Sequence, residues 1–168
     1  MRLPLELLID RYQKNLFAAA YNVCANAQDA EDVVQDTFLQ YYSTNKQFND
    51  EEHIKAWLLR VAINKAKDAA RRFRWKNTVS LEDLNEDIPF EAPEVETLFV
   101  EVMRLPEKYR VAIHLFYYED MAVKDIAECL QISEGSVKMR LSRGRDLLKQ
   151  KLTEDEDNDR SGKIQKCG

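Results

Sequence analysis

The sequence predicts an all-α protein made of two small helical domains joined by an acidic linker, with a helix-turn-helix in the second domain. Three observations lead to this prediction. The 168 residues include only 4 Gly and 4 Pro, which are few turn residues for a sheet-rich fold. Apolar residues recur at helical spacing in several segments. The length suits one ordinary domain or two small ones, and the distribution of charge favours two.

The formal net charge of −5 hides a strong segregation of charge along the chain. Residues 60–76 carry seven basic side chains and one acidic, and residues 138–151 carry six basic and one acidic. Residues 77–101 carry eight acidic side chains and no basic one. These shifts predict four parts: a domain at 1–76, an acidic linker at 77–94, a second domain at 95–152 and a disordered acidic tail at 153–168.

Two helices are predicted in the first half of the N-terminal domain. Apolar residues from Leu5 to Val23 follow helical spacing and form the core face of a first helix. A second helix starts near Asp29, a plausible N-cap. Its outward face is acidic, and by spacing alone a solvated surface explains that face. The outward residues are Glu31, Asp32, Gln35 and Asp36.

A third helix is predicted from about Glu52 to Trp75, with a basic stripe along one side. Trp57 lies at the edge of this stripe. Cations can meet phosphates, flat rings can stack on unpaired bases and an amide can pair with base edges, so the stripe suits a nucleic acid. The alternative is that Trp57 is a core residue and the arginines are solvated. The stripe comprises Arg60, Asn64, Lys67, Asp68, Arg71 and Arg74.

The C-terminal domain begins with a helix that places Pro106 at its first position. His114 lies beside the apolar face of this helix and is better explained as a packed residue than as a catalyst or ligand, because no second metal-type ligand is near. Val123–Leu130 then forms a short helix with one buried face. Ser133 is a good N-cap for the helix that follows.

The last helix has an apolar inner face and a basic outer face. Val137, Leu141, Leu148 and Leu152 point inward, and Gly144 allows close packing beside them. A short helix, a three-residue turn and a basic second helix are typical of a helix-turn-helix whose second helix enters the major groove, although many helical hairpins share this outline. The outward positions are Lys138, Met139, Ser142, Arg143 and Asp146, with Arg140 and Arg145 on the flanks.

Several functional classes find no support in the sequence. Cys24, Cys129 and Cys167 are odd in number and widely spaced, which argues against a disulfide framework or a zinc site. No Gly-rich phosphate loop, activated nucleophile or metal cluster is present, so we expect neither an enzyme nor a cofactor. The segment MRLPLELLIDRYQKN lacks a signal-peptide core, and no later run approaches bilayer length. We expect a soluble, cytoplasmic protein.

Three segments, in order, give the chain a family likeness: DAEDVVQDTFL, WLLRVAINKAKDAARR and LPEKYRVAIHLFYYEDMAVKDIAECLQISEGSVKMRLSRGRDLL. They resemble bacterial RNA polymerase sigma factors of the small, two-domain extracytoplasmic function (ECF) group. The likeness covers nearly everything from Leu5 to Leu152. In the family these segments dock on core polymerase, engage the minus-ten promoter element and bind the minus-thirty-five element, respectively.

The resemblance implies site residues position by position. Asp29, Glu31, Asp32, Gln35 and Asp36 match the polymerase-docking helix. Phe48, Trp57, Arg60, Asn64, Lys67 and Arg71 match the minus-ten region, Phe48 lying in a loop that forms a pocket for a flipped base. Ser136, Lys138, Met139, Arg140, Ser142, Arg143 and Arg145 match the minus-thirty-five region.

The chain departs from the family pattern at three positions. Met139 replaces a small polar residue, which predicts an apolar contact to a base. Ala122 replaces the usual hydroxyl cap, at a cost of about 1 kcal/mol. Ile63 replaces a common arginine beside Asn64. All three changes could alter promoter choice.

The resemblance implies a promoter-specificity subunit that is monomeric when free, whose partners are core RNA polymerase, promoter DNA and an anti-sigma factor that clamps both domains. The alternative is a stand-alone helix-turn-helix regulator. That alternative predicts tight DNA binding without polymerase and a symmetric site.

Overall fold

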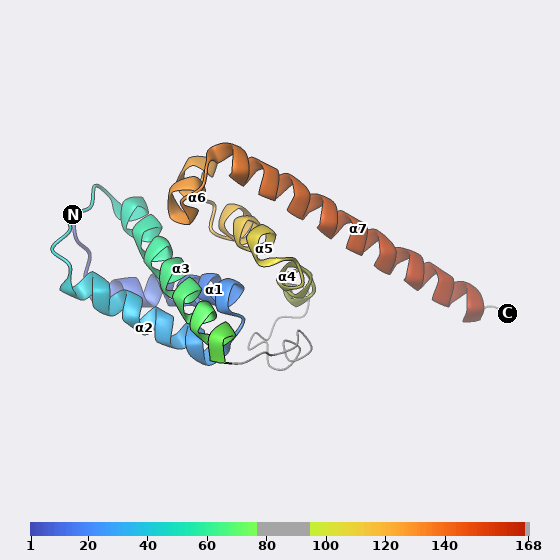
Figure 1. Ribbon diagram of the computed structural model, residues 1–168, viewed down its shortest axis with the longest axis horizontal. Coiled ribbons are helices and arrows are strands. Elements are labelled where there is room, and N and C mark those ends of the chain that lie inside the picture. Colours follow the sequence, from blue (N-terminus) through green and yellow to red (C-terminus); the bar gives the residue numbers. More distant parts are fainter. Residues whose placement is uncertain (77–94, 167–168) are drawn as a thin grey trace.

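The computed structural model describes residues 1–76 and 95–166, and within these ranges all regular structure is helical (Figure 1). This confirms the predicted all-α fold with two helical domains. The predicted linker at 77–94 lies outside the described residues. The elements are α1 (Leu5–Cys24), α2 (Ala27–Ser43), α3 (Glu51–Lys76), α4 (Val95–Met103), α5 (Glu107–Ile113), the π turn η2 (His114–Tyr118), α6 (Val123–Leu130) and α7 (Glu134–Lys166).

Helices α1, α2 and α3 form a bundle around a common apolar core. Leu8, Leu16, Leu58 and Ala62 are at most 1% exposed. Leu8 and Leu16 lie on the face of α1 that the sequence pattern assigned to the core. Ala25 adopts a left-handed conformation with φ 53°, and its N–H donates to the carbonyl of Tyr21, which ends α1. The chain then turns directly into α2.

The C-terminal domain packs α5 and α6 against the first half of α7. Pro106 is the N-cap of α5 rather than its first helical residue, because the helix starts at Glu107. The short helix Val123–Leu130 is confirmed, and its N-cap Ala122 makes no side-chain capping hydrogen bond. Between α5 and α6 lies the π turn, which no sequence pattern predicted.

The structure corrects the expected disordered tail over residues 153–166, and residues 167–168 lie outside the described residues. Helix α7 continues to Lys166 and extends away from both domains (Figure 1). Residues 153–161 contain neither glycine nor proline. Adding residues to an existing helix also avoids the unfavourable nucleation step. An acidic composition without apolar periodicity therefore does not by itself exclude a helix.

Burial keeps the two described cysteines protonated. Cys24 and Cys129 are free thiols. Desolvation raises the pKa of Cys24 to about 11 and that of Cys129 to about 12. Both are therefore unreactive thiols near neutral pH.

A hydrogen-bonded carboxylate joins α1 to the start of α3. Arg11 Nη1 donates to both carboxylate oxygens of Glu51 at 2.7 and 2.8 Å, and the Tyr12 hydroxyl donates to Oε1 at 2.6 Å. These donors, Tyr12 first and then Arg11, lower the pKa of Glu51. Glu51 also lies in the first turn of α3, where a negative charge interacts favourably with the helix dipole.

We expect Glu51→Gln to lower the melting temperature slightly at pH 7 and to have progressively less effect in acid. A carboxyl whose folded-state pKa is lowered stabilises the fold above its unfolded pKa of about 4.3, and this contribution is lost as the pH falls through the folded value. Thermal unfolding from pH 7 to pH 3 measures the effect. Glu52→Gln, at the exposed neighbour, is the control. A wild-type-minus-variant difference that does not shrink in acid would contradict the prediction.

Candidate functional site

Helix α2 presents an acidic face because its opposite face is anchored in the core. Val33, Val34, Phe38 and Tyr41 are buried. The cap differs from the prediction, since Asn26 rather than Asp29 is the N-cap, and Asn26 Oδ1 accepts from the Asp29 N–H at 2.9 Å. Asp29 is instead half-buried in the first turn. The exposed residues of the predicted face are Glu31, Asp32, Gln35 and Asp36.

Two apolar residues extend this acidic face and were missed by the sequence reasoning. Leu39 is 63% exposed and Tyr42 is 73% exposed. They follow Asp32 and Gln35 by helical spacing, so they lie on the same side of α2. Large apolar side chains on an outward arc are the signal that could have identified them. The α2 face therefore consists of Glu31, Asp32, Gln35, Asp36, Leu39 and Tyr42.

Helix α3 carries the predicted basic stripe on its solvent side. Arg60, Asn64 and Arg71 are exposed, and Trp57 and Lys67 are half-buried. Their spacing places them along one side of the helix. A single helix therefore holds three cations and an amide in a line that can follow a nucleic-acid backbone.

Phe48 does not present a ring to a ligand in this structure. It is only 2% exposed. Its ring stacks on Tyr41 with 5.8 Å between centroids, and it meets Trp57 edge-on at 5.6 Å. Its ring therefore belongs to the core in this structure, and the expectation that Phe48 contacts DNA stays a prediction. Phe48 packs edge-on against Trp57, and burial in the core stabilises its apolar ring more than exposure on the loop surface would.

The loop that contains Phe48 is held in place by Arg2, a residue that no sequence pattern had singled out. Arg2 donates to the backbone carbonyls of Tyr41, Thr44 and Lys46 at 2.7, 2.8 and 3.0 Å. Its guanidinium also lies 4.6 Å from the centre of the Tyr41 ring. Arg2 therefore restrains the conformation of the loop beside the basic stripe.

Helices α6 and α7 form the helix-turn-helix. Gln131 ends α6 in a left-handed conformation with φ 56°. Ser133 Oγ accepts from the Ser136 N–H at 3.1 Å, which confirms Ser133 as the cap of α7. Met139 is 50% exposed. Lys138, Ser142, Arg143 and Arg145 are also exposed, whereas Ser136 and Arg140 are half-buried.

Two arginines of α7 are held by tyrosines on the preceding elements. Arg145 Nη1 donates to the Tyr117 hydroxyl at 3.0 Å. A hydrogen bond from Arg143 is the largest cause of the lowered pKa of Tyr109. Both arginines flank the buried Gly144, so they lie at the borders of the exposed face. Lys138, Met139 and Ser142 form its centre.

Models of two protein families match the chain in order. Residues 8–76 match the family described as Sigma-70 region 2. This range includes α2 and α3. Residues 100–148 match the family described as Sigma-70, region 4, which includes the helix-turn-helix. The two matches coincide with the two helical domains.

Full-length relatives show the same relationship. The chain is 27% identical over 162 residues to the ECF RNA polymerase sigma factor SigW of Bacillus subtilis, a match that covers 86% of this chain and 87% of the relative. It is 31% identical over 163 residues to the ECF RNA polymerase sigma-E factor of Haemophilus influenzae, covering 87% and 86%.

A solved structure has the same fold. The sigma factor RpoE from Bartonella quintana, crystallised in complex with the anti-sigma factor NepR, superimposes with a TM-score of 0.70 at 21% identity, covering 88% of this chain and 96% of that one. Of the helices that the structure describes, none is long and apolar enough to span a membrane. The chain belongs to the ECF RNA polymerase sigma factors, which are the promoter-specificity subunits of RNA polymerase.

Proposed function

We propose that three exposed surfaces divide the work of promoter recognition between them. The α2 face binds core RNA polymerase, the basic stripe of α3 holds the minus-ten element with its bases unpaired, and the exposed face of α7 reads the minus-thirty-five duplex. The observation that carries this assignment is that each surface lies on its own helix and is fixed by a buried opposite face. Rigid helices hold contacting groups more precisely than loops do.

The α3 surface has the chemistry that strand opening requires. Extruding a base costs a few kcal/mol, which stacking and hydrogen bonds in a pocket can offset. Trp57 is half-buried, and helical spacing places it on the same side of α3 as Arg60 and Asn64. Arg60, Lys67 and Arg71 neutralise phosphates, whereas Asn64 is suited to a base edge.

On α7 the exposed centre reads bases and the flanks contact phosphates. Lys138, Met139 and Ser142 are exposed in the N-terminal half of the helix, the part that approaches base edges in a helix-turn-helix. Arg140 and Arg145 serve the backbone. The methionine offers a thioether and a methyl group, which suit the methyl group of thymine.

The protein acts with partners and not by catalysis. Sigma factors are generally transcription initiation factors without a catalytic activity of their own. We propose that this chain acts in the cytoplasm, where its polymerase is, and that an anti-sigma factor binds both domains. The resemblance to a sigma factor solved with its anti-sigma factor supports that partner. The alternative of a stand-alone regulator is not favoured, because both family regions are present in order.

Reconstituted transcription tests the proposal. Transcripts sequenced after overexpression supply candidate promoters, and purified protein with core polymerase is then expected to give promoter-specific transcripts. A well-behaved sigma factor with its own promoter controls for active core. Specific DNA binding by the free protein at a symmetric site, without transcription, would instead support the stand-alone regulator.

We expect Met139→Ala and Arg140→Ala to have different effects on holoenzyme binding. Met139→Ala should relax selectivity at one base pair of the minus-thirty-five element by about fivefold or more, since one mismatched contact costs about 1–3 kcal/mol. Arg140→Ala should weaken all sequences alike and reduce the log–log salt slope by about one. Binding to a promoter library at several salt concentrations separates the two outcomes. Equal effects from both variants would refute the assignment.

A further inference from the structure

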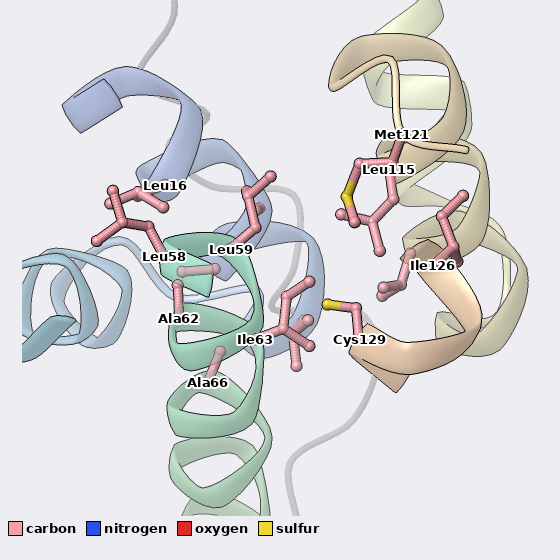
Figure 2. Packing of buried hydrophobic residues seen from close by; sticks show 14 of the residues in the cluster. Leu16, Leu58, Leu59, Ala62, Ile63, Ala66, Leu115, Met121, Ile126 and Cys129 are labelled. Carbon is pink, nitrogen blue, oxygen red and sulfur yellow. The ribbon is translucent and has the colours of Figure 1, made fainter. Parts of the chain in front are cut away.

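The two domains are not independent in this structure, because the C-terminal domain packs against α1 and α3. Leu59 and Ile63 of α3 are at most 1% exposed. Figure 2 shows Met121, Ile126 and Cys129 facing this side of α3, with the sulfur of Cys129 directed towards Ile63. Burial of these side chains favours a closed arrangement of the domains through the hydrophobic effect.

A polar cluster forms the second part of this interface. Glu119 is only 3% exposed, and its Oε2 accepts from Asn15 Nδ2 at 2.9 Å. Lys55 Nζ donates to the Glu119 backbone carbonyl at 3.0 Å and lies 3.8 Å from Oε2. Asn22 Nδ2 lies 3.1 Å from His114 Nδ1. The buried Glu119 carboxylate of the C-terminal domain therefore contacts Asn15 and Lys55 of the N-terminal domain.

The π turn η2 and its C-cap place His114 and Glu119 at this interface. The Glu119 N–H donates to the His114 carbonyl at 3.2 Å, so residues five apart lie one above the other. His114 Nε2 is 3.4 Å from Glu119 Oε1, and neither it nor Asn22 Oδ1 has a hydrogen-bond partner among the described residues. Buried polar atoms without partners destabilise the closed arrangement relative to one that admits water. The polar contacts therefore favour one arrangement of the two domains, and the buried atoms without partners make it easier for the domains to separate.

The closed arrangement is too compact to read both promoter elements. Elements centred at minus ten and minus thirty-five are about 25 base pairs apart, or about 85 Å along B-form DNA. Cys129 faces Ile63, which adjoins Asn64 in the chain (Figure 2). Lys138 follows Cys129 by nine positions, so the two residues can be at most about 32 Å apart even when the chain between them is fully extended. Hence α3 and α7 cannot reach both elements until the domains separate.

We propose that the contacts of Asn15 and Lys55 with Glu119 form an intramolecular latch that keeps the free factor closed and that must open for promoter recognition. This inference rests on the proposed function for its consequence, whereas the latch itself is a property of the free chain. When only a fraction of a protein is competent to bind, its apparent affinity falls by that fraction. The latch therefore reduces promoter engagement by free factor without any second protein.

The sharpest test is the near-isosteric substitution Asn15→Asp. It replaces the amide that donates to Glu119 with a carboxylate, so two negative charges face each other in the closed form only. Gln13→Glu adds the same charge at an exposed position of the same helix and is the matched control. Combining Asn15→Asp with Glu119→Gln exchanges donor and acceptor and should restore the closed form.

Small-angle X-ray scattering of the free, full-length chain measures the latch without reference to function. Wild type and Gln13→Glu are expected to match the closed structure. Asn15→Asp should give a larger radius of gyration with unchanged helical content by circular dichroism, and the double variant should return to the wild-type value. A wild type that scatters as two separated domains, or an Asn15→Asp variant that stays compact, would overturn the latch.

Transcription with limiting factor measures the consequence. Asn15→Asp is expected to lower the concentration of factor needed for half-maximal promoter-specific transcription by about tenfold, with the double variant close to wild type. An expanded variant whose half-maximal concentration is unchanged would show that the closed form has no inhibitory role. If no variant supports transcription while scattering changes as expected, the latch stands and the proposed function fails.

Discussion

Reversing two charges, Asp32→Lys with Asp36→Lys, is expected to lower the affinity for core RNA polymerase about a hundredfold or more, which corresponds to about 2.7 kcal/mol. Both carboxylates are exposed on the α2 face, next to the exposed Leu39 and Tyr42. A surface with acidic groups beside large apolar side chains suits a partner that offers basic groups around an apolar patch. Juxtaposing like charges at such an interface costs several kcal/mol.

Competition for core polymerase against a labelled sigma factor measures this loss. The matched control is Glu6→Lys with Asp10→Lys, which changes the net charge equally at two exposed positions of α1. If the control weakens binding as much as the α2 variant, net charge rather than the α2 face determines affinity. Tyr42→Ala alone is expected to weaken binding by a smaller factor, because it removes apolar contact without adding repulsion.

Helical periodicity was sufficient to predict the buried sides of α1, α2, α6 and the first part of α7. Leu152 of α7 was predicted to face inward but is 45% exposed, and α4 was not predicted. The pattern of Ile126, Ala127 and Leu130 identified α6 with its correct ends, and the hydroxyl of Ser133 identified the start of α7. Both features depend on residues close together in the sequence. The same local reasoning placed Asn64 and Met139 on exposed faces, where the structure has them.

Features that depend on distant residues could not be predicted in this way. Phe48 lies in a polar loop, and only the rings of Tyr41 and Trp57, brought close by the fold, explain why it is buried. Arg2 acts on a loop more than forty residues away. Glu119 and His114 reach the domain interface through a π turn, for which local propensities give no distinct signal.

For the acidic tail, composition led to a wrong prediction of the backbone conformation. Its composition resembles that of disordered segments, yet it continues a helix that the C-terminal domain has already nucleated. Low hydrophobicity does not by itself report backbone conformation. The charge change along α7, basic before Leu152 and acidic after it, therefore lies on one continuous helix.

The largest loss of stability is expected for Gly144→Leu, at the closest approach of α7 to α5. A Cβ atom at this position would lie 2.9 Å from Ile113 Cγ1 and 3.5 Å from Tyr109 Cβ. Ile113 is buried and cannot move aside freely. Overpacking of this kind costs about 3 kcal/mol, which exceeds the gain of about 1 kcal/mol from replacing a helical glycine.

We therefore expect Gly144→Leu to unfold the C-terminal domain at a lower temperature and to abolish transcription that depends on the minus-thirty-five element. Gln150→Leu, at an exposed site on the same helix, should leave the melting temperature nearly unchanged. Binding to core polymerase through α2 should persist, because α1 to α3 have their own core. Calorimetry together with the competition assay distinguishes this domain-limited loss from global unfolding. A Gly144→Leu variant with wild-type melting would show that α5 and α7 do not pack as described.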